Sequence, residues 1–117
     1  MRGQRYVLEL PGGDVVATGS LLRLGEKCSG LASIATHKTH QRQGWGTLMT
    51  RCLMAMGQLE RQDMGFFLFS EISPDFYQRL GFRPVPQIWQ KHAPSVAMQS
   101  GSFEPSIEEY NYLNTYF

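Results

Sequence analysis

This sequence of 117 residues contains few cysteines and has almost no net charge. Its two cysteines, Cys28 and Cys52, lack the CxxC spacing of a metal or redox site. The formal net charge is only +1, which argues against a basic surface for nucleic acid. We therefore expect two free thiols, a reducing compartment such as the cytoplasm, and no nucleic-acid partner.

Long apolar runs are absent as well. The N-terminal residues lead into only a short apolar segment, so the sequence predicts neither a signal-peptide core nor a membrane span. Hydrophobic residues make up 42% and charged residues 18% of the chain, which is typical of a globular protein. A chain of this length encloses one hydrophobic core, so we expect a single domain over residues 1–117.

Turns rich in glycine or charge divide the first third of the chain. Residues 6–10 and 15–24 are expected to form an antiparallel hairpin around the turn at residues 11–14. After a second turn at residues 25–27, residues 31–36 are apolar on both faces, as in a central strand.

An amphipathic helix is expected from Thr47, ending at Gly65. Apolar residues recur there at spacings of three and four, which is typical of a helix with one buried stripe. These residues are Leu48, Met49, Cys52, Leu53, Met56 and Leu59. Residues 66–70 then form a strand parallel to residues 31–36, because a helical crossover joins the two strands.

Ser73, Pro74 and Asp75 predict the start of a short second helix that stops at Gly81. Beyond it, prolines interrupt the chain, and strands are expected near residues 88–89 and 96–98. The segment that begins with residues 105–109 fits either a terminal helix or an edge strand.

The six residues from Gln41 to Gly46 join the third strand to the long helix and include two glycines and no acidic group. The unpaired N–H groups and positive dipole end of a helix N-terminus attract anions. Gly44 and Gly46 would let a diphosphate approach the main chain, and Arg42 adds a positive charge. The segment therefore predicts a phosphate pocket.

The spacing of the glycines also bears on two other phosphate-binding motifs. A Walker loop is excluded, because no glycine here is followed by the required Lys and Ser or Thr. A dinucleotide fingerprint fits poorly, since seven residues separate the strand from the first glycine and Met49 stands where a small residue is needed. A plain connection that happens to contain two glycines stays open on the segment alone.

Residues 31–56 resemble the acetyl-CoA-binding motif of the GNAT superfamily of N-acetyltransferases. That motif has Gln or Arg, two variable residues, Gly, one variable residue, and then Gly or Ala, and Gln41–Gly46 fills every position. The segment SPDFYQRLGFRPV resembles the second hallmark of the family, a short helix with Tyr77 four residues before the pair Gly81 and Phe82. The resemblance extends over about residues 5–98.

The resemblance implies an α/β (α+β) fold with the mixed sheet of acyl-CoA N-acyltransferases, here an N-terminal antiparallel hairpin followed by a central βαβ unit. The first strand and helices of the family have no counterpart, so we expect a shortened member with residues 99–117 as a C-terminal tail. The sheet surface left uncovered is expected to be covered by a second copy, as a homodimer, or by the aromatic tail. The aromatic tail residues are Tyr110, Tyr112, Tyr116 and Phe117.

The resemblance also implies acetyl-CoA as the acetyl donor, held in an opening between the third and fourth strands. The strand before the motif would hydrogen-bond the pantetheine arm, and backbone amides of the motif would hold the diphosphate. Ser70 or Ser73 stands where the family often has an Asn that touches the arm. The implied cofactor-binding residues are Ile34, Ala35, Thr36, Gln41, Arg42, Gln43, Gly44, Trp45, Gly46, Thr47, Ser70 and Tyr77.

Tyr77 matches the family position that gives a proton to the departing thiolate, although without the family a core aromatic on a short helix beside Phe76 would be the better explanation. No Glu lies on residues 31–36 to act as a base, so His37 or a water chain would take that role. Glu71 is the nearest acid to the second motif. No metal site is expected, because His37 and His40 have no third ligand.

The expected activity is acetyl transfer from acetyl-CoA to a primary amine, of a small molecule or a peptide, by direct attack on the thioester. The alternative is a non-catalytic acyl-CoA-binding sensor or interaction module. The sequence does not identify the acceptor.

Overall fold

The computed structural model describes residues 3–101, 105–114 and 117. Among these residues, six strands form one mixed sheet in the order β1-β2-β3-β4-β6-β5. The strands are β1 (Gly3–Glu9), β2 (Val15–Arg23), β3 (Cys28–Thr36), β4 (Gly65–Ser70), β5 (Arg83–Pro84) and β6 (Val96–Gly101). The helices are α1 (Trp45–Arg61), α2 (Pro74–Gln78) and α3 (Ile107–Asn111), with 3-10 turns η1 (Lys38–His40), η2 (Gln87–Trp89) and η3 (Tyr112–Asn114).

The sheet has the topology expected from the sequence. β1, β2 and β3 are antiparallel neighbours, and α1 then crosses over so that β4 lies parallel to β3. Gly13 has φ 96° in the turn between β1 and β2, a conformation that favours glycine. The predicted hairpin and βαβ unit are therefore confirmed, and β6 and β5 extend the sheet beyond β4.

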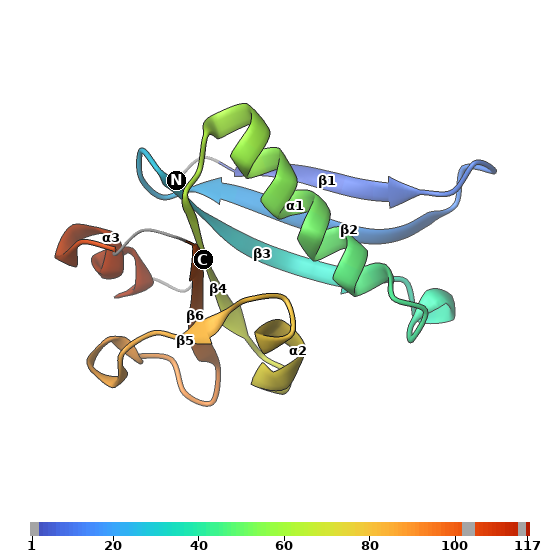
Figure 1. Cartoon of the computed structure of the whole chain (residues 1–117). Coiled ribbons are helices and arrows are strands. Elements are labelled where there is room, and N and C mark those ends of the chain that lie inside the picture. The colour runs from blue at the N-terminus through green and yellow to red at the C-terminus, as the bar shows by residue number, and fades with distance from the viewer. Residues whose placement is uncertain (1–2, 102–104, 115–116) are drawn as a thin grey trace.

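The strands β3 and β4 are paired over only part of their length. Among the described residues their ladder runs from Cys28 to Leu31 on β3, and the second half of β3 continues without β4 (Figure 1). Ser33 lies where the β2–β3 register shifts, and its φ of 55° is left-handed. The expectation of burial on both faces is wrong for this half, because Ser33 and Ala35 are exposed where the strands part.

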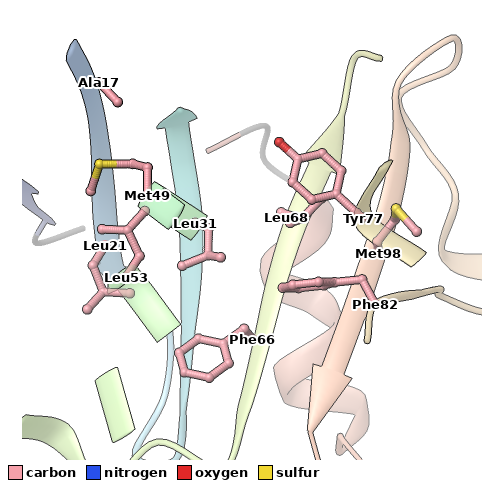
Figure 2. Close-up of a cluster of buried hydrophobic side chains, with 10 residues drawn as sticks. All are labelled: Ala17, Leu21, Leu31, Met49, Leu53, Phe66, Leu68, Tyr77, Phe82 and Met98. Carbon is pink, nitrogen blue, oxygen red and sulfur yellow. The ribbon is translucent and has the colours of Figure 1, made fainter. Parts of the chain in front are cut away.

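Helix α1 covers one face of β1, β2 and β3 (Figure 1). Its buried stripe is centred on Met49, Leu53 and Gly57. Leu48 and Leu59, which the sequence predicts in that stripe, are 42% and 81% exposed, because helical geometry turns them away from this line. Figure 2 shows the core on this face, which we call the α1-side core. Its buried residues are Ala17, Leu21, Leu31, Met49, Leu53, Phe66, Leu68, Tyr77, Phe82 and Met98.

A second core, which we call the tail-side core, contains the C-terminal helix. Tyr110 of α3 and Leu113 of η3 are buried there against Phe67 and Ala97 of the sheet. A capping box starts α3, in which Ser106 Oγ accepts from Glu109 N and Glu109 Oε1 accepts from Ser106 N. Of the two readings of this segment, helix is correct. Tyr116 lies outside the described residues.

Two other boundaries differ from the sequence expectation. α1 ends at Arg61, because Gln62 adopts the left-handed conformation with φ 58°, and Gly65 instead begins β4. The strand expected at residues 88–89 is wrong, since these residues form η2 after Pro86. Within the part of the chain that the structure describes, no helix is long and apolar enough to cross a membrane.

Candidate functional site

The N-terminus of α1 is built by a loop in which two residues are left-handed. Arg42 has φ 65° and Gly44, the N-cap, has φ 85°. No acidic residue lies in the first turn of the helix, so its positive end is not neutralised locally. The side chain of Gln41 donates to the Thr36 carbonyl at 3.5 Å, and the loop is thereby held against the end of β3.

A cavity of about 430 Å³ opens at this helix end, between the second half of β3 and helix α2. It brings together ten of the twelve residues that the sequence associates with the cofactor. These are Ile34, Ala35, Thr36, Gln41, Arg42, Gly44, Trp45, Gly46, Thr47 and Tyr77. Ile72 and Phe76 line it too, although the sequence did not single them out. We call this space the helix-end cavity.

The other two residues lie outside its lining. The Gln43 side chain accepts a hydrogen bond from Trp45 Nε1 at 3.1 Å and so braces the first turn of α1. Ser70 is buried, and its hydroxyl donates to the Ile72 carbonyl at 2.7 Å, which fixes the connection from β4 to α2.

A second cavity of about 420 Å³ lies where β3 and β4 part, and we call it the strand-gap cavity. It shares Ile34, Ile72 and Tyr77 with the helix-end cavity. Its other lining residues include Glu71, from the loop after β4, and Phe117, from the far end of the chain. Tyr77 therefore stands where the two cavities meet.

Tyr77 is held by α2 and its neighbours. Ser73 accepts from Asp75 N at 3.4 Å and starts the helix, as its sequence predicted. The Tyr77 ring contacts Phe76 and Phe82 edge-on, with centroid distances of 4.9 and 6.0 Å. Figure 2 shows its hydroxyl directed away from Phe82. The residue is 8% exposed, so packing fixes its ring.

The environment of Tyr77 favours the neutral phenol. Burial raises the pKa of Tyr77 above its usual value of 10.0, and the negative charge of Glu71 adds a smaller effect in the same direction. The hydroxyl therefore remains a proton donor at neutral pH.

His37 is placed apart from Tyr77. It caps η1, with Nδ1 2.9 Å from Thr39 Oγ1, and lines a third cavity with Asp14 and His40. Among the described residues, no group of three or more His, Cys, Asp or Glu side chains is arranged to hold a metal ion.

Three residues that line these cavities were not predicted as site residues from the sequence. Phe76 lies within the second motif and Ile72 directly precedes it, so the local sequence indicates both. The sequence identifies Phe117 only as an aromatic residue of the tail. It lies 40 residues from Tyr77 in the chain, and no local sequence pattern indicates that the two residues line one cavity.

Residues 2–84 match the sequence profile of the Acetyltransferase (GNAT) domain. No curated protein shows a significant match. The fold is similar to that of Rv2747 from Mycobacterium tuberculosis, a structure in complex with CoA and NLQ. The two share 16% identity over 85% of this chain and 76% of that chain, with a TM-score of 0.71.

Two further solved structures are similar. A GNAT family acetyltransferase from Elizabethkingia anophelis with acetyl-CoA bound shares 13% identity, covers 86% of this chain and 76% of its own, and has a TM-score of 0.70. An IAA acetyltransferase from Bacillus cereus shares 18% identity over 86% of this chain and 79% of its own, also with a TM-score of 0.70. At these identities the similarity establishes the fold.

Proposed function

This chain belongs to the GNAT acetyltransferase family, and from that premise we propose that it transfers the acetyl group of acetyl-CoA to a primary amine. Acetyl-CoA is the donor in this family. The observation that carries the proposal is that a buried, neutral Tyr77 stands where the helix-end and strand-gap cavities meet. A donor entering from one cavity and an acceptor entering from the other would meet at its hydroxyl.

The helix-end cavity has the chemistry that a diphosphate and an amide-bearing arm require. Backbone N–H groups at the first turn of α1 suit phosphate oxygens, and Arg42 adds positive charge. Ala35 and Thr36, which follow the part of β3 that pairs with β4, line this cavity, and their backbone groups suit an arm lying alongside as an added strand. When bound, acetyl-CoA supplies the electrophilic thioester carbon.

Tyr77 is proposed as the general acid. The neutral amine nitrogen forms a bond to the acetyl carbon as the carbon–sulfur bond breaks, and the Tyr77 hydroxyl gives its proton to the departing sulfur and regains one from solvent. The surplus proton of the amine passes to solvent, and the exposed Glu71 at the mouth of the strand-gap cavity is a carboxylate that can carry it. His37 lines neither of the two cavities that contain Tyr77. We therefore do not expect His37 to contact the acceptor directly.

Replacing the Tyr77 hydroxyl tests this role. Tyr77→Phe keeps the ring that packs against Phe76 and Phe82, so acetyl-CoA affinity measured by calorimetry should change little. Turnover, followed as CoA release with a panel of amines, should fall on the order of 10²-fold. Tyr112→Phe is the matched control, because Tyr112 lines neither the helix-end nor the strand-gap cavity.

Two results would contradict the proposal. Unchanged turnover of Tyr77→Phe would exclude Tyr77 as the proton donor. Binding of acetyl-CoA without turnover by the unaltered protein would instead favour a non-catalytic acyl-CoA sensor.

We also propose that the chain is a single acetyltransferase domain that acts in the cytoplasm as a homodimer. Among the described strands, β1 pairs only with β2 and forms one edge of the sheet, and Val7 on β1 is 51% exposed. An open strand edge favours pairing with a second copy. Light scattering should give twice the chain mass of 13.3 kDa, and a particle of 13.3 kDa would contradict the dimer.

A further inference from the structure

Phe117 lies against the middle of the sheet, far in sequence from the residues it contacts. Its ring meets Phe69 of β4 edge-on, with centroids 4.9 Å apart. On β3 it covers Gly30, where even a methyl group would overlap the ring. Because Gly30 has no side chain, the ring reaches the sheet and becomes one wall of the strand-gap cavity.

The lining of this cavity has a distinctive chemistry. Most of its side chains are apolar, and Phe69 and Phe117 supply two aromatic rings. Glu71 has the single charged side chain among the residues that line it. An aromatic and aliphatic wall with one carboxylate is complementary to one ammonium group on an apolar body.

We propose that the strand-gap cavity is the acceptor subsite and selects a primary monoamine with an apolar body, and that Phe117 is a specificity-determining residue. This inference rests on the proposed acetyl transfer, because it names the acceptor for that reaction. Glu71 draws the ammonium group to the mouth of the cavity, and the rings of Phe69 and Phe117 contact the body of the amine.

Other amine classes fit this lining less well. A polyamine would bring further ammonium groups against apolar side chains, where burying an unpaired charge is costly. An aminoglycoside also carries several ammonium groups, so it meets the same cost with one carboxylate in the lining.

The test compares kcat/KM for several amines in the unaltered protein and in two variants, each of which takes the Phe117 ring out of the cavity lining in a different way. In the unaltered protein, kcat/KM for 2-phenylethylamine should exceed that for spermidine and for kanamycin. Phe117→Ala deletes the ring, and Gly30→Ala displaces it by overlap. Both should lower kcat/KM for 2-phenylethylamine by roughly tenfold, mainly through KM, as expected for lost contacts in an apolar pocket. Methylamine, which has no body to touch the wall, should be affected much less.

Tyr112→Ala is the control for general damage to the tail. Tyr112 packs against the tail-side core as Phe117 does but does not line the strand-gap cavity. Its selectivity should match that of the unaltered protein. Equal use of all the amines, or an equal loss in Tyr112→Ala, would overturn the proposal.

A binding measurement separates this proposal from the catalytic one. 2-Phenylethylamine is titrated by calorimetry into each protein saturated with CoA. Binding that weakens in Phe117→Ala and Gly30→Ala supports the subsite even if no amine is acetylated, in which case acetyl transfer alone fails. Absence of binding in the unaltered protein would overturn the acceptor subsite.

Discussion

At Asp63, burial and hydrogen bonding act in opposite directions on one carboxyl group. The residue is 5% exposed, and its Oδ2 accepts from Ser29 Oγ at 2.5 Å. Its Oδ1 is buried with no hydrogen-bond partner in the part of the chain that the structure describes. Burial raises the pKa of Asp63 above 3.8, and it outweighs the Ser29 hydrogen bond and the charges of Arg61 and Arg23, which lower it.

Asp63 should therefore reduce stability at neutral pH. A raised pKa in the folded state means that the native protein binds this proton more tightly than the unfolded chain does. The stability that the protonated group contributes is complete at low pH and is lost as pH rises through the folded pKa. Asp63→Asn does not titrate, so the unaltered protein should gain stability relative to it as pH is lowered from 7 toward 4. Urea denaturation at several pH values measures the difference in the free energy of unfolding between the two proteins. A difference that does not change with pH would show that burial does not raise the pKa of Asp63.

Single residues differ in how far the sequence revealed their roles. Gly44 was identified correctly as a loop glycine, because a helix start after a glycine is a local pattern. Gly30 was not singled out, since its need for glycine comes from Phe117, which is 87 residues away in the chain. A role that depends on contact with a residue far away in the chain cannot be predicted from the neighbouring sequence.

Among the elements, α1 supplies both packing and the site. Gly46, in its first turn, has an ordinary backbone conformation, and a methyl group there would lie 3.5 Å from Thr36 Oγ1 and 3.6 Å from a Phe76 ring carbon. These are van der Waals contacts, so the protein tolerates the methyl group. The methyl group would nevertheless enter the helix-end cavity that Gly46 lines.

Gly46→Ala should separate stability from cofactor binding. Alanine favours a helix over glycine by about 1 kcal/mol, so thermal unfolding should occur at the same or a higher temperature. Affinity for acetyl-CoA, measured by calorimetry, should fall by about tenfold, equivalent to about 1.4 kcal/mol, because the main chain is less accessible. Gln58→Ala, on the exposed side of α1, is the control and should bind normally. A stable Gly46→Ala protein with full affinity would argue against a cofactor at this helix end.

Element order was predictable where local chemistry decides it. Hydrophobic periodicity located β1 to β4 and α1, and Ser73 with Pro74 located α2. The boundaries that failed depend on context. Gln62 ends α1 in a left-handed conformation that usually requires glycine. Residues 88–89 belong to η2, where Trp89 stacks on Tyr110 of α3, a contact that is distant in sequence.

The whole molecule has a core on each face of the sheet, and the tail supplies much of the second. Leu113 is fully buried in the tail-side core, together with Tyr110 and Phe67. The sequence placed aromatic residues in the tail and offered the tail or a second copy as the cover for the sheet. It could not choose between them, because that choice depends on contacts between residues far apart in the chain.

Leu113→Ala should therefore destabilise the protein as a core substitution does. We expect a loss of about 2–5 kcal/mol in the free energy of unfolding, measured by urea denaturation followed through tryptophan fluorescence. Ile107→Ala, at a site 71% exposed on α3, should change it by less than about 0.5 kcal/mol. If the two variants behaved alike, the packing of the tail against the sheet would be disproved.

The short ladder between β3 and β4, from Cys28 to Leu31 on β3, also divides the sheet into two parts. One part contains β1, β2 and β3 with α1, and the other contains β4, β6 and β5 with α2 (Figure 1). Beyond Leu31, β3 and β4 have no backbone pairs among the described residues, and Ile34, Ile72 and Tyr77 line the opening between the two parts. A molecule bound in that opening would contact both parts of the sheet and would link them where no backbone ladder does.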